Sequence, residues 1–322
     1  MPRLKVKTLL LLSLATLSAS VFAQTTVSAR PGTLNYVEGQ ASVQGRLIDP
    51  GSVSNTTLQT GEILSTTNGK TEVLLTPGVF LRLGGNSSAK MISTNLTRTE
   101  VRLDHGQANV EVDQIYKQNT ILIDLPNGQT QLLKNGLYTF DVGNSTVRVF
   151  DGEADVFPGK DLQAAVKPIV LKGSHQFVLT GDGGKPQRFD KDKAQDDLYK
   201  WSSLRSQYLG TANLNLASEY AGTSGFYPGW YWAGGPYGYT WLPGNGLFWS
   251  PYGYGFYSPY YLYGGGPIYG YGRGFYGYRG GYGYRGGYAY RAGSYASAYH
   301  GNVGGFHGAS GGFHGGGGGG HR

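Results

Sequence analysis

Residues 58–112 contain the pattern that most limits what this chain can fold into. Their centre, residues 71–84, reads TEVLLTPGVFLRLG, so that two short apolar strands flank a Pro77-Gly78 turn. Segments of a few β-forming residues, each followed by a turn signal, recur on both sides of this centre. Short strands at such spacing are typical of an antiparallel β-sandwich or a rolled sheet. We therefore predict an all-β domain.

Turn signals extend this prediction along the chain. Asn-Gly pairs are the strongest short hairpin signal, because both residues accept the positive φ that a tight turn requires. Three such pairs occur, at residues 68–69, 127–128 and 135–136. We predict a β domain over residues 32–182, and we expect Leu74 and Phe80 to face its core.

The amino-acid composition divides the chain near residue 222. Of the 55 Gly and 26 Tyr, 34 and 20 lie beyond this position, and no Asp or Glu follows Glu219. The net charge of +7 consists of +3 in the first seven residues and +5 in residues 223–322, which leaves −1 for the part between. The basic balance is therefore no sign of a basic globular domain. The absence of Cys excludes disulfides, thiolate metal sites and a catalytic thiol.

Residues 1–23 have the pattern of a secretory signal peptide. A positive start is followed by an apolar run over residues 8–21 and by Ala23, a small residue that permits cleavage before Gln24. The run is shorter than the roughly 20 residues that span a bilayer. We expect an exported protein of the periplasm or the cell surface, without a stable membrane span after cleavage. The alternative is an uncleaved membrane anchor.

A helical segment is predicted over residues 189–221. One apolar stripe with spacings of three and four is typical of an amphipathic helix; it consists of Ala194, Leu198, Trp201, Leu204 and Tyr208. We expect Asp192 to cap its start and Gly210 to end it, with a second short helix over residues 212–220. This segment is expected to pack on the β domain or to lead away from it.

The remaining chain consists of two segments of biased composition. Residues 222–268 are dense in Trp, Tyr, Phe and Pro, and we expect them to be partly ordered at most. Residues 269–322 repeat Gly, Tyr, Arg and His with almost no aliphatic residues, and we expect them to be disordered. The candidate contacts to an envelope polymer or protein are Trp230, Trp232, Trp241, Trp249, Arg279 and Arg285. The alternative is a flexible spacer.

The sequence contains no convincing set of catalytic residues. Asp104, Glu111 and Asp113 are close in sequence, and paired carboxylates can act as acid and base when burial separates their pKa values. We expect Glu111 and Asp113 to share a strand face and to be solvated. Of the three functions that we consider, an enzyme acting on cell-wall polymer is therefore the weakest; the other two are given below. No cofactor or metal site is predicted.

Four phrases in a fixed order resemble the FecR-like domains of exported bacterial proteins. They are residues 58–66, 71–83, 103–108 and 147–154, within a region of similarity over residues 32–156. The arrangement with a polar helix and a Gly/Tyr/Trp-rich tail looks like the FecR-domain proteins of soil bacteria such as acidobacteria. The resemblance implies a periplasmic or surface β domain that binds another envelope component.

Two functional hypotheses follow from this resemblance. The name-giving members of the family are membrane-anchored regulators that relay an outer-membrane signal to a sigma factor, and they carry a cytoplasmic segment before a transmembrane helix. Here only seven residues precede the apolar run. We therefore expect a non-enzymatic envelope binding or scaffolding protein, whose partner is an envelope protein or polysaccharide and not nucleic acid. The alternative is a periplasmic signal-relay protein anchored by an uncleaved N-terminus.

Overall fold

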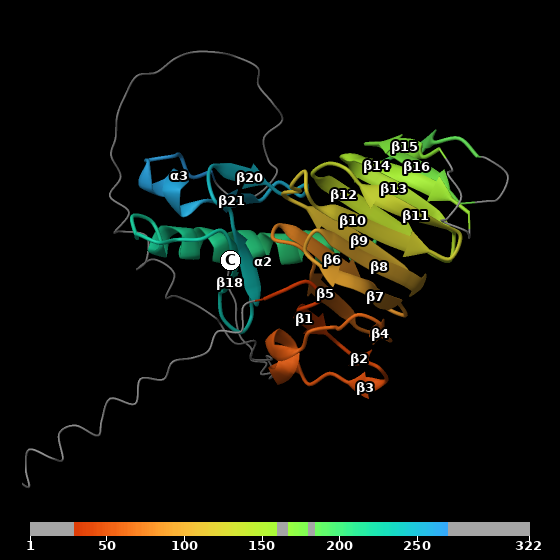
Figure 1. The fold of residues 1–322 in the computed structure, drawn as a ribbon, viewed down its shortest axis with the longest axis horizontal. Helices are drawn as coiled ribbons and strands as arrows, with labels where there is room; N and C mark the ends of the chain where they lie inside the picture. The colour runs from red at the N-terminus through yellow and green to blue at the C-terminus, as the bar shows by residue number, and fades with distance from the viewer. Residues whose placement is uncertain (1–28, 160–166, 180–183, 270–322) are drawn as a thin grey trace, which may run out of the picture. The chain divides into compact units, whose positions relative to one another are not determined.

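The computed structural model describes residues 29–159, 167–179 and 184–269 (Figure 1). The predicted cleavage site at Ala23 and Gln24 lies outside the described residues. The same holds for the tail from residue 270 onward, with Arg279 and Arg285. In the part of the chain that is described, no helix is both long enough and apolar enough to cross a membrane.

The described residues form a β-sandwich, as the sequence predicts. One sheet has eight strands, and every neighbouring pair in it is antiparallel. In spatial order its strands are β1 (Leu34–Glu38), β5 (Lys70–Leu74), β6 (Val79–Leu83), β9 (Gln107–Val112), β12 (Gly136–Asp141), β13 (Thr146–Asp151), β16 (His175–Val178) and β17 (Gln187–Arg188).

The second sheet has nine strands. Its pairs are antiparallel except for β8 and β10, which run parallel. In spatial order the strands are β15 (Ile169–Lys172), β14 (Glu153–Pro158), β11 (Gly128–Leu132), β10 (Thr120–Leu125), β8 (Arg98–His105), β7 (Ser88–Asn95), β4 (Ile63–Thr66), β2 (Ala41–Val43) and β3 (Arg46–Leu47). A short 3-10 helix, η1 (Pro50–Asn55), packs beside β1.

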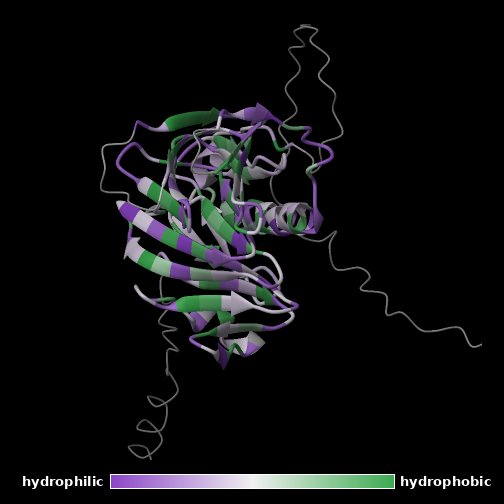
Figure 2. Cartoon of the chain, turned by 90° about the vertical axis from the view of Figure 1, so that its right-hand side faces the viewer, coloured by the Kyte–Doolittle hydropathy of each residue, from purple (hydrophilic) through white to green (hydrophobic). Residues whose placement is uncertain are grey.

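The core lies between the two sheets and follows from the two-residue period of a strand. Along β6, Val79, Leu81 and Leu83 enter the core, whereas Phe80 and Arg82 point to the outer face. The same alternation of hydrophobic and hydrophilic residues is visible along other strands in Figure 2. Each sheet thus supplies apolar side chains to one continuous core.

Leu74 and Phe80 are fully buried, but the prediction that they face the core of the sandwich is wrong. Both belong to a separate apolar cluster with Leu209, Trp241 and Phe256. The register explains the difference, because both residues alternate with the inward residues of their strands. Their outer face is buried under later parts of the chain, which the local pattern of two hairpin strands cannot indicate.

The three Asn-Gly pairs play two different roles. Asn127-Gly128 connects β10 to β11 in a hairpin, as predicted. The pair at residues 68–69 leads from β4 to β5, and the pair at residues 135–136 leads from β11 to β12, so both carry the chain from one sheet to the other. A Cβ atom on Gly69 would lie 2.5 Å from the carbonyl oxygen of Glu38. Close packing of backbone therefore requires this glycine.

Helix α2 (Asp197–Glu219) follows the sandwich and is continuous over its whole length. Asp196 caps its start by accepting a hydrogen bond of 2.7 Å from the backbone N–H of Tyr199. The predictions of a start capped by Asp192 and an end at Gly210 are wrong, because α2 begins later and continues through the glycine. The cost of a glycine inside a helix is about 1 kcal/mol, and packing along the whole length of α2 outweighs it.

The buried face of α2 is more polar than its predicted apolar stripe. Leu198 and Trp201 are buried as expected, but Leu204 and Tyr208 are each about half exposed. The residues that face the sheet and the following segment instead include Ser202, Arg205, Ser206 and Asn213. The buried face of α2 is polar because the outer face of the sheet that it contacts carries charged side chains.

Two hairpins and a short helix occupy a segment for which the sequence predicts at most partial order. We call residues 226–269 the aromatic cap. It contains the hairpin of β18 (Gly229–Trp232) and β19 (Tyr239–Leu242), the hairpin of β20 (Leu247–Trp249) and β21 (Gly255–Tyr257), and the helix α3 (Pro259–Tyr263). The cap packs against α2, and its Trp241 and Phe256 cover Leu74 and Phe80 on the outer face of the eight-stranded sheet.

Candidate functional site

A buried polar network between the eight-stranded sheet and α2 is the candidate functional site. Strand β5 supplies Glu72, β6 supplies Arg82, and β9 supplies Asn109 and Glu111. These four side chains are at most 1% exposed, and so is Asp113, which directly follows β9. Charged groups buried to this extent require partners, because an unpaired charge in a protein interior is strongly unfavourable.

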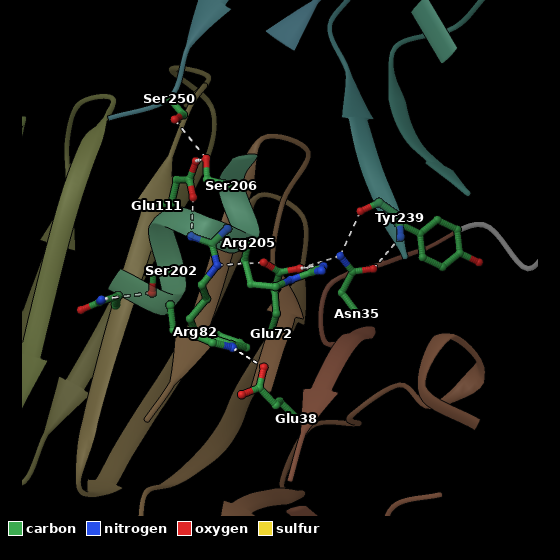
Figure 3. A network of polar contacts seen from close by, with 12 residues as sticks. Asn35, Glu38, Glu72, Arg82, Glu111, Ser202, Arg205, Ser206, Tyr239 and Ser250 are labelled. Carbon is green, nitrogen blue, oxygen red and sulfur yellow. Dashed lines mark hydrogen bonds and ion pairs between the residues drawn. The ribbon is translucent and has the colours of Figure 1, made fainter. Parts of the chain in front are cut away.

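Arg82 lies at the centre of the network and joins two carboxylates (Figure 3). Its Nε donates to Oε2 of Glu72 at 2.8 Å, and its Nη1 donates to Oε2 of Glu111. Glu72 pairs with Arg82 in register, whereas Glu111 pairs with Phe80, so Arg82 reaches Glu111 diagonally across β6 and β9. Charges of alternating sign thus lie on three adjacent strands.

Helix α2 contributes the second cation of the network. The Nη2 of Arg205 donates to Oε1 of Glu72 at 2.9 Å and to the carbonyl oxygen of Tyr237 at 2.8 Å. The guanidinium carbon lies 4.0 Å from the ring centroid of Tyr36. One side chain therefore connects the sheet, the helix and the first hairpin of the aromatic cap.

Two serines of α2 complete the contacts to β9. Ser206 donates to Oε1 of Glu111 at 2.6 Å, and its hydroxyl lies 3.0 Å from that of Ser250 in the cap. Asn109 donates to the hydroxyl of Ser202 at 3.2 Å. A small polar residue at both helix positions allows α2 to approach the charged strands closely.

Two buried asparagines bind the cap through its backbone. Asn35 of β1 accepts from the backbone N–H of Tyr239 at 2.6 Å and donates to the carbonyl oxygen of the same residue at 2.9 Å. Asn213 of α2 binds the backbone of both cap hairpins. It accepts from the N–H of Tyr257 and donates to the carbonyl oxygens of Trp241 and Tyr257. Each amide satisfies backbone groups that burial would otherwise leave unpaired.

The charges of the network balance within the protein. Burial raises the pKa of Glu72, but the neighbouring Arg205 and Arg82 together outweigh burial and hold this pKa below its ordinary value. Burial, and after it the Glu111 carboxylate, raises the pKa of Asp113 well above its ordinary value, which favours the neutral acid. Two cations then face two carboxylates, with Asp113 beside them as a neutral group.

The raised pKa of Asp113 predicts a specific pH dependence. Because the pKa is higher in the folded state than in the unfolded state, stability falls as pH rises from about 4 toward the folded-state pKa. Replacing Asp113 with Asn removes this dependence, so the variant gains stability over the wild type as pH increases, by at most about 1.4 kcal/mol per pH unit. Urea denaturation at several pH values between 5 and 8 measures the difference, with the exposed Asp192→Asn as control. A constant difference across this range contradicts the prediction.

The family comparison covers the strands that carry this network. Residues 56–155 match the family model described as FecR protein. These residues form a FecR-like domain. The match includes β5, β6 and β9, and it ends before α2 and the aromatic cap. The resemblance predicted from the sequence is thus confirmed, and Arg205 reaches Glu72 from outside the FecR-like domain.

Solved structures give a weaker likeness. Two crystal structures of a candidate anti-sigma factor from Parabacteroides distasonis, at 1.65 Å and 2.50 Å resolution, each resemble the chain with 13% identity and a TM-score of 0.33. The first similarity covers 44% of this chain and 63% of that one, and the second covers 48% and 72%. The chain therefore spans less than two thirds of the first structure's length. Similarity at this level carries no argument about function. A comparison with curated proteins gives no match.

The three carboxylates considered from the sequence do not form one group. The expectation that Glu111 and Asp113 are solvated is wrong, because α2 and the aromatic cap cover this face of the FecR-like domain. Asp104 lies on β8 in the other sheet, where it accepts a hydrogen bond of 2.7 Å from Arg102. Among the described residues, no group of three or more His, Asp and Glu is placed to hold a metal ion.

The four tryptophans predicted as partner contacts differ in exposure. Trp241 is fully buried in the cap, which leaves its indole no surface for a partner, and Trp230 is half-buried against Phe80. Trp232 and Trp249 are 42% and 46% exposed. Trp232 and Trp249 therefore remain predicted contacts to a partner, and both lie beyond the FecR-like domain.

Sequence reasoning missed the network, although one signal for it was present. The phrase VFLRL on β6 places an Arg among apolar residues, and Glu72 precedes it in the facing strand. A charge inside such an apolar strand indicates a buried partner, since Arg and Glu are almost never fully buried unless paired. The partner on α2 has no comparable local signal.

Proposed function

We propose that the protein is a non-enzymatic regulator of the cell envelope, which relays a signal through its FecR-like domain by binding an envelope protein. The observation that carries this proposal is the match of residues 56–155 to the FecR family. The regulatory role is the one that the family resemblance implies. It takes precedence here over the scaffolding role favoured by the sequence.

The buried network supports binding rather than catalysis. Glu72 and Glu111 each accept hydrogen bonds from Arg82, and the burial of Asp113 favours its neutral form. A general acid or base must reach the substrate within hydrogen-bond distance, and these carboxyl groups are closed off by α2. The network fastens α2 and the cap to the FecR-like domain, so a partner that binds either part acts on both.

Gene deletion tests the regulatory role. We expect deletion to change the transcription of a defined gene set, and the full chain to restore it. A Leu81→Asp chain, which places a charge in the core of the sandwich, is expected not to restore it, whereas the matched Leu96→Asp chain, altered at an exposed position, is expected to do so. An unchanged transcript profile after deletion overturns the proposal.

The N-terminus decides how such a relay is anchored. We propose that the protein is exported. If it relays a signal, residues 1–23 are expected to remain uncleaved and to anchor it in the membrane. N-terminal sequencing of the protein from fractionated cells checks this: Met1 or Pro2 in the inner membrane supports the anchored relay. A start at Gln24 in the periplasmic fraction contradicts it and favours the second candidate function.

The second candidate function is an envelope scaffold that binds polysaccharide through the aromatic cap. It is favoured by the composition of residues 222–269, which contain Trp and Tyr but no Asp, Glu, Lys, Arg or His. Exposed aromatic rings on an uncharged surface suit the apolar faces of sugar rings better than an anionic polymer. Weaker retention of Trp232→Ala than of the wild type on immobilised neutral polysaccharide supports this function, and equal retention counts against it.

A further inference from the structure

Asp113 is a buried carboxyl group without a cation of its own. It directly follows β9 and is fully buried, and among the described residues no hydrogen-bond donor reaches either of its carboxyl oxygens. Glu111 lies two residues earlier, on the same side of the strand, and the two carboxyl groups are within hydrogen-bond reach of each other. Two carboxylates this close do not both ionise in a protein interior, so the pair holds one proton.

The charged and titratable groups around this pair do not replace its proton. They come from four neighbouring elements: Glu72 of β5, Arg82 of β6, Arg205 of α2 and Tyr252 of the cap. The guanidinium of Arg82 already binds both glutamates of the network, and Arg205 binds Glu72. Burial raises the pKa of the Tyr252 phenol, which therefore stays neutral. The adjoining residues of β12, 136–137, carry no titratable side chain.

Helix α2 and the aromatic cap shield the pair from water. Ser206 of α2 donates to Glu111 at 2.6 Å. The backbone N–H of Asp113 donates to the carbonyl oxygen of Gly78 at 2.8 Å, and a Cβ atom on this glycine would lie 3.4 Å from the indole of Trp241 in the cap. The opposite face of β9 packs into the core of the sandwich. Water therefore reaches both carboxyl groups when α2 and the cap lift from the sheet.

Access of water couples the release of a proton to this opening. In the open state the pKa of Asp113 returns to its ordinary value of about 4, whereas burial and the Glu111 carboxylate raise this pKa in the closed state. Between the two pKa values the closed state binds one proton more than the open state, so rising pH shifts the equilibrium toward opening, by up to about tenfold per pH unit. Glu72 adds nothing in this range, because its pKa is lowered and its ion pairs weaken only in more acidic solution.

We propose that the proton held by Glu111 and Asp113 controls the docking of α2 and the cap, so that its loss with rising pH releases both from the FecR-like domain while the sandwich stays folded. Separate release is favoured because α2 contacts the sheet through polar groups, Arg205 and two serines among them, which bind water once they are free. The core between the two sheets is not part of this contact. The device does not depend on the proposed regulatory role, since it concerns docking within one chain.

Hydrogen exchange of the full chain at several pH values between 5 and 8 tests this control. Protection factors, which are corrected for the intrinsic pH dependence of exchange, report local opening. We expect protection of the amides in α2 and β18–β21 to fall by up to about tenfold per pH unit, whereas protection in β10 of the other sheet stays constant. Asp113→Asn keeps the shape of the neutral acid but has no proton to lose, so its protection is expected not to vary with pH. The matched control Asp192→Asn, altered at an exposed position, is expected to behave as the wild type.

A second variant separates the proton from the hydrogen bonds of the contact. Ser206→Ala removes the bond from α2 to Glu111 but keeps the carboxyl pair, so it is expected to lower protection of the cap by a similar factor at every pH and to leave the slope unchanged. The proposal is overturned if the wild-type cap shows no pH dependence, or if β10 loses protection as fast as the cap. A wild-type slope in Asp113→Asn, or loss of the slope in Ser206→Ala, overturns it as well.

Discussion

Replacing Arg82 with Met is expected to lower the free energy of unfolding by about 3–5 kcal/mol, the usual cost of removing one partner from a buried ion pair. The substitution keeps most of the side-chain volume but removes the cation that pairs with Glu111, which keeps the hydrogen bond from Ser206. Glu72 keeps Arg205, so the loss is concentrated at Glu111. Urea denaturation of the full chain measures the change.

Two further variants separate the charge effect from lost packing. Arg102→Met removes an ion pair with Asp104 whose side chains are 44% and 35% exposed, and it is expected to cost at most about 1 kcal/mol. The double variant Arg82→Met with Glu111→Met removes both charges, so it is expected to be more stable than Arg82→Met alone. A double variant less stable than either single one shows that packing, not unpaired charge, dominates at Arg82.

The β-sandwich was predictable because its signals are local. Along β6, the alternation of Val79, Leu81 and Leu83 with Phe80 and Arg82 identifies a strand without knowledge of any neighbour. The hairpin at Asn127-Gly128 is equally local. Family phrases over residues 58–154 follow the same strands, which is why the FecR-like domain was recognised from sequence alone.

The candidate site was not predictable because its contacts are distant in sequence. Arg205 meets Glu72 across 133 residues, Ser206 meets Glu111 across 95, and Asn35 meets the backbone of Tyr239 across 204. Helix periodicity identifies an apolar stripe on the assumption that a helix packs on an apolar surface. Here the surface is charged, so α2 buries Arg205 and two serines and leaves Leu204 in solvent.

The aromatic cap illustrates a second limit of sequence reasoning. Biased composition usually indicates a segment without a core, and residues 222–268 share much of the composition of the tail. They fold because their Trp and Phe residues cover an apolar surface that the sheet and α2 already present, formed by Leu74, Phe80 and Leu209. Order in this segment thus depends on a surface to which Leu74 and Phe80, more than a hundred residues earlier in the chain, contribute.

Replacing Trp241 with Ala is expected to release the cap from the sheet. The indole is fully buried, lies 5.0 Å from the ring of Phe248 and 5.8 Å from that of Phe256, and shares a cluster with Leu74 and Phe80. Truncating a buried Trp to Ala typically costs about 3–5 kcal/mol through lost burial and the cavity left behind. Hydrogen exchange of the backbone amides in β18–β21 is expected to accelerate more than exchange in β9.

The outcome at Trp241 distinguishes a cap that opens separately from the sheet from a cap that unfolds together with it. The matched controls Trp232→Ala and Trp249→Ala truncate half-exposed indoles, so they are expected to cost far less and to leave exchange in β19 unchanged. Because Arg205 and Asn213 fasten the same hairpins through carbonyl oxygens of Tyr237 and Trp241, a released cap also loses these bonds. If Trp241→Ala accelerates exchange in β9 as strongly as in the cap, the two parts unfold together and the cap is an integral layer of the FecR-like domain.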